Sequence, residues 1–337
     1  MTSAGATADT AAGTTGTTGT TARPTSVGGR PLVTGLLALL GSGSSNQVGA
    51  ALGARAFADI GPAGVVALRQ LVAAAVLLPV ARPRVRHFTW SQWWPTLLLA
   101  LVFAVMNLAL YTAVDRLGLG LAVTLEFLGP LAVAVAGSRS MVDLGCALAA
   151  GVGVYVLVLP GPSSDYVGIG LGLLAAACWT SYILLNRLLG ARLPGVQAPA
   201  VATSVSALAY LPVLVALAGS GRWTTASLAY AVAAGVMSSV VPYAVDLLAL
   251  RHVPARFFGV FMSVNPVLAA VSGLLLLGQV LAAREWAGIA VVVVANAVAV
   301  TTVRRPAPRS VAPPGTAPSG TLGTCASPPS PTTPCAP

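Results

Sequence analysis

The stretch AVDRLGLGLAVTLEFLGPL, residues 113–131, decides the fold, because a related stretch recurs later in the chain. When the sequence is shifted on itself by 136 residues, 113–131 lies over 249–267, and Pro130 lies over Pro266. Each stretch ends one apolar run, makes a short polar turn and enters a second apolar run that contains the proline. At a shift of 137, the tetrapeptide LGAR at 52–55 lies over LGAR at 189–192. These two matches predict an internal repeat.

Outward from these blocks, long apolar runs alternate with short polar breaks. About 20 apolar residues in a helix cross a bilayer. The expected spans are 32–53, 62–80, 94–114, 118–137, 141–160, 167–186, 198–218, 226–249, 257–278 and 283–303. A signal peptide is the competing interpretation of 32–53, but that run starts late and is long for one. The sequence predicts an all-α integral membrane protein of about ten transmembrane helices.

Each repeat holds about five of these helices. Because five is an odd number, the second repeat enters the membrane inverted relative to the first, a recurring construction in secondary transporters. We expect a disordered N-terminal tail at 1–31, a first five-helix repeat at 32–160, a second at 167–303 and a disordered Pro-rich tail at 304–337.

The composition agrees with a lipid-facing surface. The chain is 56% hydrophobic and 8% charged, whereas soluble domains carry roughly 25% charged residues. All 18 basic residues are Arg, and they fall between apolar runs without clustering, which disfavours nucleic acid as a partner. With the N-terminus in the cytoplasm, 13 Arg lie inside and 4 outside. This positive-inside bias predicts that both termini are cytoplasmic.

Three ionisable residues lie within expected spans, and each costs about 2.5–3.5 kcal/mol to insert near a helix centre. Glu126 precedes Pro130, which removes the hydrogen bond to the Glu126 carbonyl. Carboxylate and free carbonyl together form a candidate site for an ammonium group or a proton, although a purely structural role is the alternative. Arg69 lies at a matching depth, so it can pair with Glu126 or meet a substrate carboxylate. Asp246 lies nearer the cytoplasmic end, where it can reach the interface.

Polar and aromatic residues in the spans are weaker candidates, because such side chains more often join helices or sit at the interfaces. The uncharged candidate residues are Asn46, Asn107, Tyr111, Trp179, Tyr182, Asn186, Tyr243, Ser263 and Asn265. The sequence has no P-loop, no nucleophile–base arrangement and no Cys–His metal spacing. We therefore expect neither an enzyme nor a resident metal or cofactor.

Several motifs resemble those of EamA-type transporters in the drug/metabolite transporter superfamily. They are AVTLEFLGPLAVA at 122–134, ACWTSYIL at 177–184, VPY at 241–243 with LAL at 248–250, and FGVFMS at 258–263 with PVLAAVSG at 266–273. Within the superfamily, the chain resembles the threonine/homoserine exporter group. The resemblance covers 32–303 and implies export of small polar metabolites such as these amino acids, by proton antiport, across a bacterial plasma membrane. It assigns the motif glutamate to Glu126.

The resemblance also has departures. Asn265 and Gln279 stand where the family commonly has Glu, which questions any coupling scheme that needs those acids. A multidrug or lipophilic-cation exporter on the same scaffold is the alternative function. A membrane enzyme or a non-transporting receptor is a third reading, although no reactive cluster supports it. A drug site is typically aromatic and acidic, whereas spans holding both Arg69 and Glu126 favour a zwitterion.

Overall fold

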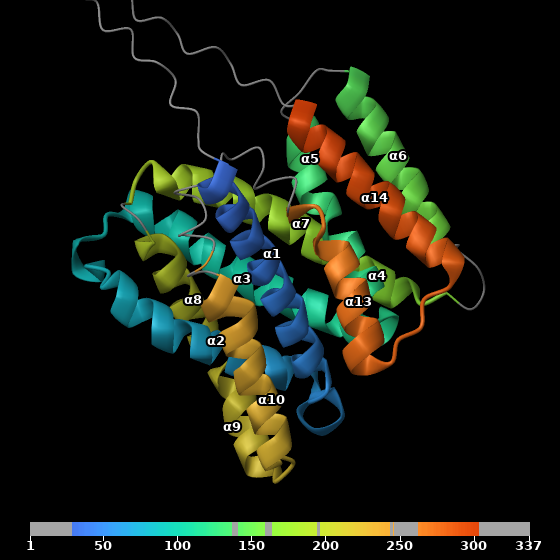
Figure 1. The fold of residues 1–337 in the computed structure, drawn as a ribbon. Helices are drawn as coiled ribbons and strands as arrows, with labels where there is room; N and C mark the ends of the chain where they lie inside the picture. Colours follow the sequence, from blue (N-terminus) through green and yellow to red (C-terminus); the bar gives the residue numbers. More distant parts are fainter. Residues whose placement is uncertain are drawn as a thin grey trace, which may run out of the picture. The chain divides into compact units, whose positions relative to one another are not determined.

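The computed structural model describes residues 29–136, 141–158, 164–193, 196–242, 245 and 262–302. Within these ranges every regular element is a helix (Figure 1). The first half of the chain contains α1 (Gly29–Ala54), α2 (Phe57–Ala81), η1 (Val85–His87), α3 (Trp90–Leu117), α4 (Leu119–Glu126), α5 (Leu128–Ala136) and α6 (Met141–Val158). The second contains α7 (Tyr166–Gly190), α8 (Gln197–Ala209), α9 (Leu211–Ser220), α10 (Thr225–Gly235), the π-helical turn η2 (Val236–Val240), α13 (Asn265–Leu277) and α14 (Ala283–Thr302).

Six of the described helices are long and apolar enough to cross a membrane, when α4 and α5 are taken together as Leu119–Ala136. The others are α2, α3, α6, α7 and α14, and the bent pair α8–α9 makes a seventh if it is one span. Shorter apolar helices cover Thr225–Val240 and Asn265–Leu277. α1 is not among the six, since the polar run 42–47 interrupts its apolar residues. The chain is therefore a multi-pass membrane protein.

Proline residues divide three of the expected spans. α4 ends at Glu126, Phe127 forms a turn, and α5 begins at Leu128, shortly before Pro130. α8 and α9 meet at a 41° bend, with Pro212 in the first turn of α9. α13 begins at Asn265 after a turn at residues 263–264, with Pro266 in its first turn. A proline removes one backbone hydrogen bond from a helix, which favours a break near each of these positions.

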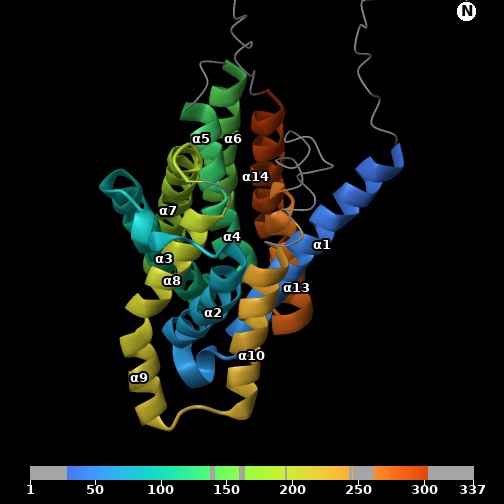
Figure 2. The ribbon, with the colours of Figure 1, turned by 90° about the vertical axis from the view of Figure 1, so that its left-hand side faces the viewer.

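Small residues bring several helices into close contact. α3 packs along α7, α6 along α14, and α2 along α8, and α5, α6 and α14 lie side by side in Figure 2. A Cβ added to Gly153 of α6 would lie 3.1 Å from the Gly288 carbonyl oxygen, and one added to Gly288 would lie 2.7 Å from the Gly153 oxygen. Backbones this close need glycine at both positions.

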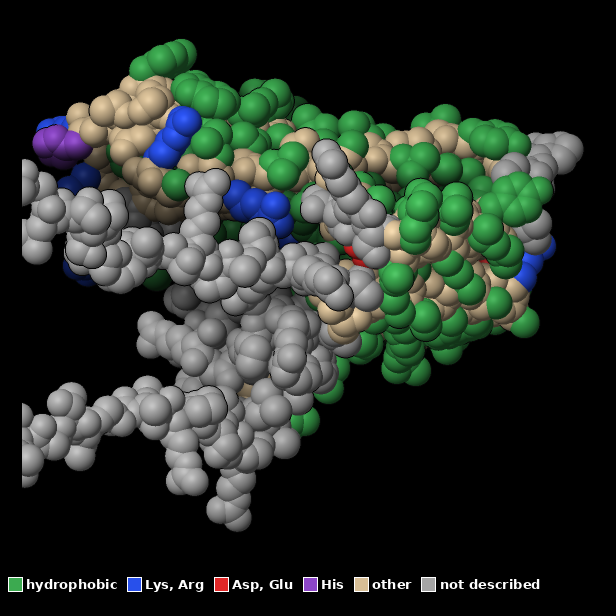
Figure 3. All heavy atoms as spheres, turned by 90° about the horizontal axis from the view of Figure 1, so that it is seen from above, with side chains coloured by type: hydrophobic (Ala, Val, Ile, Leu, Met, Phe, Trp, Pro, Cys, Tyr) green, Lys and Arg blue, Asp and Glu red, His purple; other side chains and the backbone are tan. Residues whose placement is uncertain are grey.

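The outer surface divides by chemistry. Exposed Leu, Val, Met and Tyr side chains cover α6 and α14, and hydrophobic side chains dominate the right-hand side of Figure 3, which looks down from the top of Figure 1. Arg and His side chains gather on the left of that view. The loop between α2 and α3 has four exposed basic or histidine side chains: Arg82, Arg84, Arg86 and His87. This distribution fits lipid against the helices and water against the loops.

Candidate substrate cavity

A cavity of about 340 Å³ lies among the helices and is lined by both halves of the chain. Its walls come from α1, α2, α3, α4, α7, α8, η2 and α13. Wall residues near the α3–α4 junction, such as Tyr111 and Leu119, are buried, whereas Phe103, Tyr182 and Pro199 at the other end are partly exposed. Within the described part of the chain, the cavity is thus more enclosed at the α3–α4 junction.

Arg69 of α2 forms one wall and is held from three sides. Its Nε donates to Ser239 Oγ at 3.2 Å, and its Nη2 donates to the Ser238 carbonyl at 3.2 Å. The guanidinium carbon lies 5.2 Å from the ring centroid of Tyr111, within cation–π range. Nη1 has no hydrogen-bond partner among the described residues. The arginine is therefore fixed while one nitrogen remains available to an anion.

Tyr111 of α3 lies beneath this arginine at the enclosed end. It is 1% exposed and packs edge-on against Phe57, with ring centroids 5.9 Å apart. Its hydroxyl is enclosed and has no hydrogen-bond partner among the residues that the structure describes. Buried polar groups are normally satisfied, so this hydroxyl marks the enclosed end as polar.

Glu126 lies on another wall, at the end of α4, and is 7% exposed. The turn beside it is fixed by Phe127, which packs edge-on against Trp179 of α7 at 4.6 Å. Glu126 does not pair with Arg69, because no ion pair within 4.0 Å joins them. Of the two roles open to Arg69, the structure does not show the ion pair: Arg69 is bound by two η2 residues, Ser238 and Ser239, and the two charged side chains lie on different walls of one cavity.

Amide side chains form a third polar feature. Gln47 of α1 donates from Nε2 to Asn265 Oδ1 at 3.2 Å, and Asn265 donates from Nδ2 to the Met262 carbonyl at 2.9 Å. On α2, Gln70 donates to Ser206 Oγ at 2.8 Å. Asn107 of α3 bonds back to the Phe103 carbonyl of its own helix at 2.8 Å. Most of these amides thus already have partners within the protein.

The structure brings eight of the sequence candidates to this cavity: Asn46, Arg69, Asn107, Tyr111, Glu126, Trp179, Tyr182 and Asn265. Pro130 and Ser263, in the helix breaks beside the cavity, do not line it, and neither does Asn186, which bonds back to the Tyr182 carbonyl. Tyr243 and Asp246 lie outside the described residues. Sequence reasoning missed Gln47, Gln70 and Ser239 as wall residues. Polar residues inside apolar runs were the available signal, but their direction about the helix axis depends on tertiary packing.

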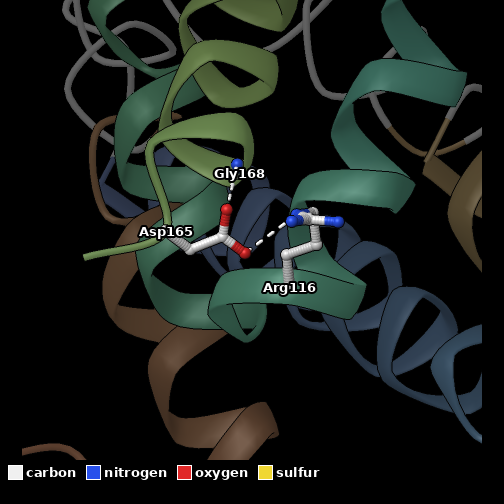
Figure 4. A network of polar contacts seen from close by, with 3 residues as sticks. All are labelled: Arg116, Asp165 and Gly168. Carbon is white, nitrogen blue, oxygen red and sulfur yellow. Dashed lines mark hydrogen bonds and ion pairs between the residues drawn. The ribbon is translucent and has the colours of Figure 1, made fainter. Parts of the chain in front are cut away.

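Polar contacts join the two halves of the chain near the enclosed end. Arg116, at the end of α3, pairs with Asp165 at 2.8 Å, and Asp165 accepts from the Gly168 amide at the start of α7 (Figure 4). The Gly168 hydrogen bond and then Arg116 lower the pKa of the Asp165 carboxyl below its usual range. Arg55 donates to the Leu276 carbonyl at 2.7 Å. These contacts hold the helix ends together there.

Gln279 contributes to the same end. Its Oε1 accepts from the Leu119 amide at 2.9 Å, at the start of α4. The first amides of a helix lack partners within the helix, so the side chain caps α4 across the two halves. The amide oxygen supplies this contact without a negative charge.

The chain is similar to known transporters. Residues 166–301 match the model of the EamA-like transporter family. The threonine/homoserine exporter RhtA of Salmonella typhimurium (strain SL1344) is 35% identical over 285 residues, covering 84% of this chain and 96% of that protein. The chain belongs to the EamA-like transporter family. RhtA of Escherichia coli (strain K12) is 33% identical with the same coverage.

A solved protein crystal structure is similar in fold to this EamA-family chain, with a TM-score of 0.53. The alignment covers 80% of this chain and 96% of the chain in that crystal structure. At 18% identity this likeness concerns the fold alone. As an EamA-family member, the chain is a membrane transporter rather than an enzyme. Within the described ranges, no three His, Cys, Asp or Glu side chains are grouped so as to hold a metal ion.

Proposed function

We propose that this transporter exports small polar amino acids of the threonine and homoserine type across a bacterial plasma membrane, in exchange for protons. The observation that carries the proposal is a cavity with one cationic and one anionic side chain on separate walls. A zwitterionic amino acid offers a carboxylate to Arg69 and an ammonium to Glu126. Relatives named as threonine/homoserine exporters support this substrate class.

Burial explains how Glu126 would couple the two ions. An unpaired carboxylate buried in a membrane protein is costly, and Glu126 is 7% exposed and has no ion pair within the described part of the chain. It therefore favours states in which it holds either a proton or the substrate ammonium. Because one carboxylate serves both, each displaces the other, and proton entry drives amino-acid exit.

For the architecture, we propose ten crossings arranged as two inverted five-helix repeats, 32–160 and 167–303, which rock about the cavity. A shift of about 136 residues matches α1 with α7, α2 with α8–α9, α3 with α10, α4–α5 with α13, and α6 with α14. The helix contacts are preserved when each helix is replaced by its equivalent in the other half. The contact between α3 and α7 corresponds to that between α10 and α1, and the contact between α4 and α7 corresponds to that between α13 and α1.

Contacts between a helix or residue and its own counterpart in the other half support the same symmetry. α2–α8, α4–α13 and α6–α14 are all in contact. Gln70 and Ser206 are hydrogen bonded and lie 136 residues apart. Gly153 and Gly288 approach each other reciprocally and lie 135 apart. Contacts between equivalent residues are expected where a pseudo-two-fold axis passes through an inverted-repeat transporter. The match of one family model to 166–301 also fits a repeat unit.

The Arg distribution supports an orientation with both termini in the cytoplasm. The α2–α3 loop, with its exposed Arg82, Arg84 and Arg86, is then cytoplasmic. The enclosed end with the Arg116–Asp165 pair faces outward. In this orientation the described helices represent a state closed to the outside.

Transport in everted vesicles tests the proposed function. Vesicles with an acidic lumen should accumulate labelled threonine and homoserine, because inward movement there corresponds to export. A protonophore should abolish the accumulation, and vesicles lacking the protein should show none. Failure to transport either compound while transporting a lipophilic cation would contradict the proposal and support a drug exporter.

A further inference from the structure

Gln47 lines the cavity, and a chain of hydrogen bonds that begins beside Pro266 sets the orientation of its amide group. Proline has no amide hydrogen, so the Met262 carbonyl, four residues before it, loses its helical partner. Asn265 Nδ2 donates to this carbonyl at 2.9 Å. A carbonyl only accepts, so the Asn265 amide nitrogen must face Met262 and its oxygen must face away.

The same reasoning orients Gln47. Asn265 Oδ1 receives the Gln47 amide nitrogen at 3.2 Å. Because Oδ1 only accepts, the nitrogen end of Gln47 must face Asn265, which leaves Gln47 Oε1 pointing elsewhere. Oε1 has no hydrogen-bond partner among the described residues and is not enclosed by protein. Gln47 itself lines the cavity and is 3% exposed.

Neighbouring contacts hold this arrangement in place. A Cβ at Gly43 would lie 3.2 Å from Asn265 Oδ1, so α1 has a glycine where the Asn265 side chain lies against it. Ser45 donates to the Met237 carbonyl at 2.9 Å, and the Asn46 carbonyl accepts from Ser238 at 2.8 Å. These bonds fix the rotation of α1 about its axis and therefore the direction of Gln47.

We propose that Gln47 Oε1 accepts the side-chain hydroxyl of the substrate and selects hydroxyl-bearing amino acids over apolar ones of equal size. This inference rests on the proposed function, in which Arg69 and Glu126 hold the carboxylate and the ammonium. The hydroxyl is then the remaining donor of threonine or homoserine. Valine and norvaline have the same shapes with a methyl group in its place, and they would leave the buried Gln47 oxygen unpaired.

The residue type at position 265 is part of this device. An ionised glutamate there could not donate to the Met262 carbonyl, because a carboxylate only accepts. Asn265 is therefore a positioning residue that both binds this free carbonyl and orients Gln47.

Competition against labelled threonine uptake in everted vesicles tests the inference. In the wild type, threonine and homoserine should inhibit about tenfold to a hundredfold better than valine and norvaline. In Gln47→Met this preference should fall close to one, through weaker inhibition by the hydroxyl compounds. Asn296→Leu is the control, because Asn296 is a similarly buried amide that does not line the cavity and bonds to the Val292 carbonyl of its own helix; its selectivity ratio should stay at the wild-type value.

Asn265→Leu provides a second test if Gln47→Met does not fold. It keeps Gln47 but removes the group that orients it, so selectivity should decrease there as well. An unchanged ratio in the folded variants would overturn the inference. An equal weakening of inhibition by threonine and by valine would overturn it too, because Gln47 Oε1 would then accept from the ammonium group that both share. A wild type that transports no threonine would instead refute the proposed function.

Discussion

Arg69 and Glu126 lie on different walls of one cavity, although both stand out in the sequence for the same reason. A charge inside an apolar run is costly and therefore marks a functional candidate. The sequence could not predict their separation. Arg69 is bound by Ser238 and Ser239, which lie 169 and 170 residues away, and no local pattern links positions so distant. Gln47 was missed for a similar reason, since its role depends on Asn265.

Arg69→Met should weaken recognition of the carboxylate. The hydrogen bonds of a charged group contribute roughly 1.5–3 kcal/mol, so threonine should inhibit transport about tenfold to a hundredfold less well. Inhibition by threoninol, which lacks the carboxylate, should weaken much less. Arg222→Met is the control, because Arg222 is exposed and does not line the cavity. Equal losses for threonine and threoninol would show that Arg69 only supports the helix packing.

At the scale of helices, apolar runs and prolines were informative. The expected spans overlap the described helices, and Pro130, Pro212 and Pro266 accompany the observed breaks. The sequence treats 118–137 as one span, whereas the structure divides it at Phe127. A proline indicates a lost hydrogen bond, but the size and place of the break depend on neighbours such as Trp179, which packs against Phe127.

Gly288→Ala should destabilise the packing of α6 on α14. Its Cβ would lie 2.7 Å from the Gly153 carbonyl oxygen and 3.0 Å from the Leu157 Cα, and such overpacking typically costs about 1–3 kcal/mol. Gly151→Ala on α6 is the control, because its Cβ would meet nothing within 4 Å. Thermal unfolding in detergent should show a lower midpoint for Gly288→Ala alone. Equal midpoints would indicate that the two helices separate without cost.

For the whole molecule, the repeat visible in 113–131 and 249–267 predicts two related halves, and the helix contacts support that interpretation. The charges do not follow the repeat. Glu126 corresponds to Met262 at the 136-residue shift, and the opposite helix break has the Asn265 amide instead. One half thus supplies the candidate coupling acid and the other a neutral polar group. The sequence shows this asymmetry, but only the folded chain brings both breaks to one cavity.

Two assays on Glu126→Gln in everted vesicles test the central claim most directly. Glutamine keeps the size of the side chain but cannot bind and release a proton. We predict that an imposed pH gradient no longer drives threonine accumulation in this variant, while the purified protein retains the wild-type unfolding midpoint. Accumulation that still follows the gradient at the wild-type rate would contradict the claim that Glu126 couples proton entry to amino-acid export.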